Sequence, residues 1–262
     1  MKNKFRLLFT PGRKLDTDQL IFKKTVISFT VFFFMFGVAL FGWMKLRQLP
    51  RDQMGTNTVI RSALNTNESI FSSILSDKHL SKSYPKSEAA NPARRNGNVG
   101  MDLHKMVADF ANWNMQVVKS NGDTLHITLA DLKKLPKTEV VFNFKCIEGW
   151  SQITYWGGVK FADFIKAYGL EKETALKYIG LRTMDEKYYV GIDMASALHP
   201  QTILCYELNA QPLPIDQGYP LRLIIPVKYG VKHLKTIGTL VFSNDKPKDY
   251  WAERGYDYFT GL

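Results

Sequence analysis

An apolar stretch near the N-terminus constrains this chain most: twenty consecutive uncharged residues run from Thr25 to Met44. As a helix rising about 1.5 Å per residue it would be roughly 30 Å long, which matches the hydrocarbon core of a bilayer. Lys23-Lys24 and Lys45 border it, and no small-residue cleavage site typical of a signal peptide follows. The alternative, a buried helix of a soluble protein, would be expected to carry a polar face. We therefore predict a transmembrane helix over this stretch.

The positive charge of the chain is concentrated beside that stretch. The formal net charge is +11, yet residues 101–262 carry nineteen Lys/Arg against eighteen Asp/Glu. Residues 1–24 carry seven basic and two acidic side chains, and residues 45–100 carry nine and four. Because basic residues accumulate on the cytoplasmic side of a membrane helix, we expect the N-terminus in the cytoplasm and the remainder outside it. No motif of a nucleic-acid-binding module accompanies the charge, so we expect no nucleic-acid partner.

These patterns divide the chain into four predicted parts. They are a basic cytoplasmic tail (1–24), a transmembrane helix (25–44), a polar linker with a short amphipathic helix (45–93) and a domain (94–262). Apolar residues at helical spacing place the amphipathic helix at 67–75, where it could contact the domain or the membrane surface. The expected location is the cytoplasmic (inner) membrane, with the lipid bilayer as a partner and the domain on the periplasmic side.

The domain alternates short strands with a few short helices, which predicts an α+β fold with mixed sheets. Two apolar runs around the turn Asn121-Gly122-Asp123 predict a hairpin over 113–129. Further strands are expected at 178–181, 188–192, 202–208, 221–225 and 239–242, and helices at 130–135 and 161–168. The loop 94–100, with two Asn and two Gly, could wrap a ligand or form an ordinary turn.

One of the two cysteines, Cys146, stands at the end of a predicted strand. Alternation puts its thiol on the same face as Val140, Phe142 and Phe144, so it points into a core or a closed pocket. A soft ligand at a strand end suits a buried cofactor, although a lone cysteine is more often packing. Cys205 lies in a short apolar run and is expected only to pack.

The residues after Cys146 are expected to form its supporting loop. Glu148-Gly149-Trp150 should break the strand, and Gly157-Gly158 should end the loop. Glu148 and Trp150 are expected to brace the cysteine loop rather than to react, because turn residues beside a core strand usually pack.

A second constellation spans 217–244, twenty-eight residues that contain no Asp or Glu. Its basic side chains are Arg222, Lys228, Lys232, His233 and Lys235. On the predicted strand Arg222 shares a face with Ile224, and a buried arginine among apolar residues needs an anionic partner. Guanidinium binds phosphate or carboxylate in bidentate geometry, so a bound phosphate is one interpretation. An ion pair with a distant acid, together with solvated lysines, is the other.

Together, KCIEGWSQITYWGG and GYPLRLIIPVKYGVKHLK resemble the molybdopterin-binding domain of the sulfite oxidase family. The resemblance covers about residues 94–259 and is strongest to the bacterial branch of protein-methionine-sulfoxide reductase catalytic subunits. It implies a sulfite-oxidase-type fold and a molybdenum-molybdopterin cofactor. It also implies that Cys146 ligates molybdenum as a thiolate and that Arg222 holds the pterin phosphate. Further cofactor contacts are implied for His233, Leu234, Lys235, Thr183 and Asn98.

The resemblance implies a membrane-anchored oxidoreductase that transfers an oxygen atom, for example by reducing a small or protein-borne sulfoxide or N-oxide. Arg182 is the one arginine between Arg95 and Arg222, so the family's arginine-rich sulfite pocket is not evident. Without a haem segment of its own, the chain would need a haem or quinone-linked membrane partner for electrons. Lys23-Lys24 stands where a twin-arginine export signal would be expected. The alternatives are a tethered, non-catalytic scaffold that keeps the fold without the metal, and a binding module that works through residues 46–100.

Overall fold

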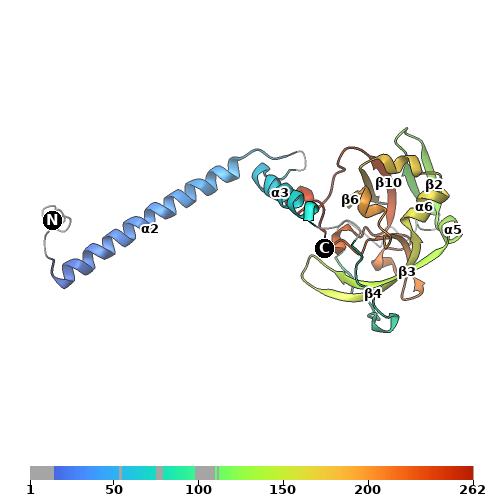
Figure 1. Ribbon diagram of the computed structural model, residues 1–262, viewed down its shortest axis with the longest axis horizontal. Helices are drawn as coiled ribbons and strands as arrows, with labels where there is room; N and C mark the ends of the chain where they lie inside the picture. The colour runs from blue at the N-terminus through green and yellow to red at the C-terminus, as the bar shows by residue number, and fades with distance from the viewer. Residues whose placement is uncertain (1–14, 53–54, 75–78, 98–109, 111, 262) are drawn as a thin grey trace. The chain divides into compact units, whose positions relative to one another are not determined.

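The computed structural model describes residues 15–52, 55–74, 79–97, 110 and 112–261 (Figure 1). Its first long element is helix α2, Thr17–Gln48, which is apolar and long enough to cross a membrane. The Asp16 side chain accepts a hydrogen bond from the backbone N–H of Gln19 and so caps the start of α2. Lys45 and Arg47 lie in its last turn, where positive charge is favourable. The helix therefore contains the predicted span and extends beyond it at both ends.

The domain holds two sheets that bear out the predicted α+β class. The first has the order β2-β1-β10-β5-β6. Its strands are β1 (Asn114–Val118), β2 (Thr124–Thr128), β5 (Tyr178–Thr183), β6 (Tyr189–Asp193) and β10 (Ile237–Ser243). The pair β1–β2 is the predicted hairpin, whereas β10 pairs in parallel with β1 across more than a hundred residues of sequence. The hairpin is thus a local feature and the parallel pair a tertiary one.

The second sheet has the order β3-β4-β7-β8, and β9 also pairs with β7. Its strands are β3 (Lys137–Lys145), β4 (Ser151–Lys160), β7 (Ile203–Leu208), β8 (Gln211–Pro212) and β9 (Arg222–Ile224). Short helices connect the two sheets: α5 (Leu129–Lys133), α6 (Phe161–Ala167) and α7 (Met194–Ala197). β3 pairs with β4, β4 pairs with β7, and β7 pairs with β9, all antiparallel. The end of β3 and the middle of β9 therefore lie in the same sheet.

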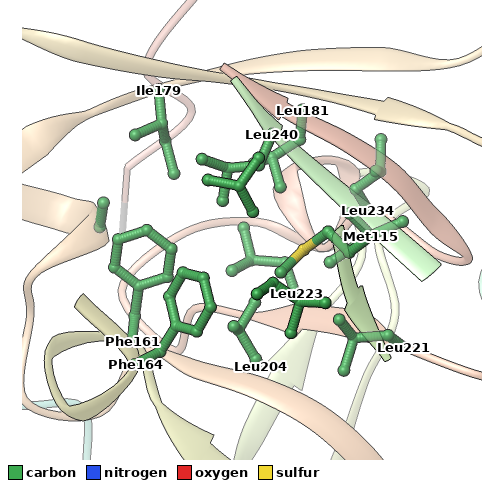
Figure 2. Close-up of a cluster of buried hydrophobic side chains, with 14 of the residues drawn as sticks. Met115, Phe161, Phe164, Ile179, Leu181, Leu204, Leu221, Leu223, Leu234 and Leu240 are labelled. Carbon is green, nitrogen blue, oxygen red and sulfur yellow. The ribbon is translucent and has the colours of Figure 1, made fainter. Parts of the chain in front are cut away.

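The main hydrophobic core lies between the two sheets. Figure 2 shows its side chains meeting: Met115, Phe161, Phe164, Ile179, Leu181, Leu204, Leu221, Leu223, Leu234 and Leu240. A second cluster, which includes Cys146, covers the opposite face of the β3–β4–β7 sheet. On β9, Leu223 faces the first cluster and Ile224 the second, as strand alternation predicts. Arg222 therefore lies on the same side of the sheet as the second cluster.

Two predictions from sequence need correction. Gly157-Gly158 does not end the cysteine loop, because both residues lie inside β4. A Cβ at Gly158 would come within 2.2 Å of the Leu204 backbone oxygen, so glycine permits β4 and β7 to approach at a β-bulge. The amphipathic helix exists as α3 but runs over Thr58–Ile74 and starts nine residues before the predicted Asn67. Val59, Ile60 and Leu64 continue the same helical spacing, which the shorter prediction missed.

Candidate cofactor site

A pocket of about 190 Å³ opens beside the end of β3. Its lining residues are Asn96, Gly97, Cys146, Ile147, Glu148, Thr183, Tyr188, Gly230, Val231, His233, Lys235, Trp251 and Tyr256. Of the residues predicted from sequence, the pocket brings together Cys146, Thr183, His233 and Lys235. Arg222 and Leu234 lie behind the wall, and Asn98 lies outside the described residues. The cysteine motif and the basic motif thus meet at one cavity.

Cys146 is held in a tight turn that follows β3. Its backbone N–H donates to the Trp150 carbonyl at 2.9 Å, and the Gly149 N–H donates to the Cys146 carbonyl at 3.1 Å. Gly149 has φ +87°, a conformation that favours glycine. The side chain is 5 % exposed, and burial raises the pKa of the Cys146 thiol. A bound metal ion would reverse that preference, because metal coordination deprotonates a thiol.

The loop side chains beside Cys146 contact one another. The Trp150 indole N–H donates to Glu148 Oε2 at 2.8 Å, and the Trp150 ring stacks on Phe144 at 5.8 Å between centroids. The Arg94 guanidinium lies 4.5 Å from the centre of the Trp150 indole. These contacts support the predicted bracing role. Cys205 is fully buried and donates its thiol to the Glu207 carbonyl, and burial raises its pKa to about 12, so it packs as predicted.

Arg222 is fully buried, and its hydrogen bonds go to neutral oxygens. It donates to the Gln217 carbonyl at 3.0 Å, to Gln217 Oε1 at 3.1 Å and to Asn96 Oδ1 at 3.0 Å. Its guanidinium also lies over the Trp156 and Phe144 rings, at 4.8 and 5.6 Å. Its Nε has no hydrogen-bond partner, and no ion pair joins it to an acid within the described part of the chain. The predicted alternative of a distant acid therefore finds no support there.

Burial lowers the pKa of Arg222 to about 10, so the guanidinium remains charged at neutral pH. Lys235, 5 % exposed, donates to the backbone carbonyls of Asn96 and Asp216, both at 2.9 Å. Burial and the nearby charge of Arg222 lower the Lys235 pKa to about 6. The charge of Arg222 thus disfavours a second charge on Lys235, and a bound anion beside them would stabilise the charged form of both side chains.

His233 lines the pocket and has one ring nitrogen without a hydrogen-bond partner among the described residues. Its Nε2 lies 2.9 Å from the Ile225 carbonyl and 3.2 Å from the Lys228 carbonyl, which fixes the proton on Nε2. Burial lowers its pKa to about 3, so the ring is neutral. Its Nδ1 is buried and has no partner among the described residues. A neutral imidazole with an unused acceptor can accept a hydrogen bond from a ligand N–H.

The other two lysines of the basic motif have structural roles. Lys228 pairs with Asp193 at 3.1 Å, and Lys232 pairs with Asp249 at 2.5 Å; both lysines are buried. They are therefore not solvated, contrary to the second alternative from sequence. Leu234 packs in the main core, and the Leu234 carbonyl accepts from the Leu223 N–H. The Leu234 N–H donates to the Lys232 carbonyl, and Leu234 is not among the residues that line the pocket.

Some lining residues were not predicted from sequence. Asn96 accepts hydrogen bonds from Arg222 with its side-chain oxygen and from Lys235 with its backbone carbonyl. It lies in the loop 94–100, whose sequence is compatible with a ligand-wrapping loop. Tyr188, Trp251 and Tyr256 complete the wall. The Tyr188 hydroxyl donates to the Val231 carbonyl at 2.6 Å. Tyr188 begins a predicted strand, whereas Trp251 and Tyr256 come from a segment without a recognisable pattern. Only the tertiary structure places all three at the pocket.

The fold and site define an α+β domain with a pocket lined by a buried cysteine and basic side chains, and comparison of sequences identifies the family. The oxidoreductase molybdopterin-binding domain matches residues 103–251, more than half of the chain, which therefore belongs to this family. The predicted fold class and the predicted enzyme class, a molybdopterin-binding oxidoreductase, are confirmed by this match.

Several named proteins are similar to this chain. It is 34 % identical over 210 residues to the provisionally named protein-methionine-sulfoxide reductase subunit YedZ1 of Azospira oryzae, covering 80 % of this chain and 79 % of that protein. It is 28 % identical over 172 residues to the protein-methionine-sulfoxide reductase catalytic subunit MsrP of Campylobacter jejuni, covering 58 % and 57 %. It is 27 % identical over 165 residues to mitochondrial sulfite oxidase of Rattus norvegicus, covering 53 % and 30 %. The chain thus spans about half of the MsrP protein and less of the oxidase.

The described residues fit a molybdopterin. Its phosphate needs a buried cation, which Arg222 supplies, and the Arg222 Nε is an unused donor. Lys235 would add a second positive charge once the anion raises its pKa. Its pterin ring carries N–H groups, and His233 Nδ1 is an unused acceptor. Its metal accepts a soft sulfur ligand, and the Cys146 thiol lines the same pocket.

Proposed function

We propose that this chain is a membrane-anchored, molybdenum-dependent oxidoreductase in which Cys146 ligates the metal. Arg222, His233, Leu234, Lys235 and Thr183 would hold the cofactor, and Asn98 remains a proposed contact from the loop that opens the domain. When bound, the molybdenum centre supplies oxygen-atom transfer coupled to two-electron redox chemistry. The meeting of Cys146, His233 and Lys235 in one pocket, with Arg222 directly behind it, is the observation that carries this proposal.

The protein's own groups provide charge, orientation and exclusion of water. Arg222 is held by Gln217, Asn96 and two aromatic rings, so its charge is positioned before any ligand arrives. An anion beside Lys235 would raise the pKa of that ammonium group from about 6 and keep it protonated at neutral pH. Tyr188 is half-buried, and desolvation of its hydroxyl raises its pKa, so the hydroxyl stays protonated and bonded to the Val231 carbonyl. Preorganised charge of this kind binds a cofactor without reordering side chains.

We propose reduction of a sulfoxide or N-oxide, small or protein-borne, as the reaction. Two electrons and two protons convert the S=O or N–O group to the sulfide or amine and one water. The names of the similar Campylobacter and Azospira proteins support this class. The word "subunit" in those names supports a partner, which we propose is a haem or quinone-linked membrane protein that supplies electrons.

The apolar helix α2 supports the proposed anchor, with the domain on the periplasmic side of the inner membrane. The helix is strongly apolar, and none of its most apolar stretch is buried in the structure. A lipid environment would cover the apolar side chains that are exposed along the helix, for example Phe34 at 70 %.

The test uses the full chain, purified in detergent from a host that makes the cofactor. A chemically reduced viologen dye supplies electrons, and methionine sulfoxide, a methionine-sulfoxide peptide and trimethylamine N-oxide are offered in turn. We expect dye oxidation with at least one of them, matched by formation of the sulfide or amine. Metal-loaded protein that oxidises no dye with any of the three would contradict the proposed reaction. Protein without metal would instead favour the non-catalytic scaffold.

A further inference from the structure

Helix α3 exposes an apolar face that the described part of the domain does not cover. Ile60, Ile70, Phe71 and Ile74 are exposed by 45, 49, 56 and 71 %. At about 3.6 residues per turn, these four side chains fall within roughly a third of the helix circumference. Asn67 is the one polar residue whose position lies among them. An amphipathic helix normally buries such a face, so its exposure needs a partner.

A neighbouring edge of α3 makes the contacts with the domain. Arg61, Leu64 and Glu68 recur at spacings of three and four and are the half-buried positions along this part of the helix. Arg61 pairs with Asp52 at 2.7 Å and donates to the Ala252 carbonyl at 2.9 Å. Burial raises the pKa of Glu68, which lies near the charges of the C-terminal segment. The polar edge is thus against the protein, while the apolar face is left open.

The start of α3 is tied to the end of α2. Asn57 donates from Nδ2 to the Leu46 carbonyl at 2.7 Å. The Thr58 N–H donates to the Pro50 carbonyl at 3.1 Å, and Arg51 and Asn57 form an isolated β-bridge. If α2 spans the bilayer, its apolar stretch ends near Met44, so α3 starts close to the outer surface of that bilayer. Lipid at this surface is the apolar material nearest to the open face.

We propose that α3 lies in the outer interface of the bilayer, with Ile60, Ile70, Phe71 and Ile74 inserted among the lipid headgroups and upper acyl chains. This rests on the membrane anchoring proposed above and adds a second contact to it. Amphipathic helices lie in the interface in this way, with the apolar face buried to a depth of about 5–10 Å. α3 carries one basic and one acidic side chain, so apolar burial rather than charge would hold it there.

This contact would orient the domain. Arg61 and Thr56 both bond the Ala252 carbonyl, and Ala252 directly follows Trp251 of the pocket wall. A helix lying on the membrane would therefore fix the pocket wall at a set height above the lipid. A single flexible tether would leave that height free. A fixed height suits electron delivery from a partner within the same membrane.

The test measures membrane depth in the full chain, reconstituted into vesicles of phosphatidylethanolamine and phosphatidylglycerol. A fluorescent NBD probe is attached to Phe71→Cys, with Ile74→Cys as a second outer-face position should the first variant fail to fold. Asn65→Cys, on another exposed side of α3, is the matched control, and Phe34→Cys reports on α2. The native thiols, 5 and 0 % exposed, are shielded from the reagent.

Spin-labelled lipid then quenches probes that lie in the bilayer. We expect emission at positions 34 and 71 to fall about two-fold, and emission at position 65 to stay unchanged, given the expected depth of insertion. Quenching at position 34 without quenching at 71 or 74 would overturn the placement of α3 and leave the anchor standing. No quenching at any position would overturn both the placement of α3 and the membrane anchor. Metal content and dye-linked turnover are independent of these outcomes.

Discussion

Lys232 and Asp249 form an ion pair in which each side chain is only 2 % exposed, and the pair joins two segments that line the pocket. Lys232 stands between Val231 and His233, and it also donates to the Gly191 carbonyl. Asp249 Oδ1 accepts from the backbone N–H groups of Trp251 and Ala252. The pair thus fixes the segment of His233 relative to the segment of Trp251, on two sides of the pocket.

Replacing Asp249 should destabilise the protein strongly. Asp249→Ala leaves the Lys232 ammonium buried without its carboxylate, which costs about 3–5 kcal/mol in comparable buried pairs. Urea unfolding in detergent, followed by tryptophan fluorescence, measures the change. Lys134→Ala, which breaks an exposed pair with Asp131, should give no measurable change. Adding Lys232→Met to Asp249→Ala should recover part of the loss, and a double variant no more stable than the single one would contradict this interpretation.

Replacing Arg222 should reduce cofactor retention. Arg222→Lys keeps one positive charge but loses the planar group that bonds Gln217 and Asn96 and stacks on Trp156. We expect the pterin content per chain to fall about tenfold or more, because at least one charge-assisted hydrogen bond is lost. The measurement is fluorescence of the oxidised pterin released from purified protein. Arg182→Lys, an exposed arginine on β5, is the control, and equal pterin content in both variants would count against a phosphate site at Arg222.

The stability of cofactor-free protein should rise with pH because of Lys235. Its folded-state pKa is about 6, below the ordinary value of 10.5, and burial is the main cause. Between these two values the unfolded chain binds one proton more than the folded chain, so the free energy of unfolding increases with pH. Below pH 6 both states are protonated and the slope should vanish.

Lys235→Met removes this titration. The melting temperature of wild type minus that of the variant should therefore increase from pH 6 to pH 9 when both proteins lack cofactor. A difference that stays flat, or that falls across this range, would show that the lysine is not held in the low-polarity surroundings that the structure gives it.

Sequence periodicity predicted the strands and faces well where one local pattern controls them. On β3 and the residue that follows it, the predicted common face of Val140, Phe142, Phe144 and Cys146 is confirmed, because all four pack in the second hydrophobic cluster. On β9 the separation of Arg222 from Leu221 and Leu223 is confirmed as well. In each case the period of two is a property of the chain itself, so the faces follow without tertiary information.

What the sequence could not predict depends on distant contacts. The glycines of β4 resemble a loop signal, and only neighbours on β7 explain them: the Leu204 backbone approaches Gly158, and the Glu207 side chain approaches Gly157. The pocket wall formed by Tyr188 and Trp251 needs β6 and the C-terminal segment in their folded positions. The role of Asn96 needs Arg222, which is 126 residues away, beside it. The parallel pairing of β1 with β10 also depends on residues that are far apart in the sequence.

The most direct test of the central claim is the molybdenum content of two matched cysteine variants. Cys146→Ser and Cys205→Ser remove buried thiols from the same hydrophobic cluster, but only Cys146 lines the pocket. Each variant is purified as the full chain, and molybdenum per chain is measured by mass spectrometry. We predict about one molybdenum per chain in wild type and in Cys205→Ser, as one thiolate site implies, with loss of the metal or of dye-linked turnover in Cys146→Ser. Full metal content and full turnover in Cys146→Ser would contradict the assignment of Cys146 as the ligand.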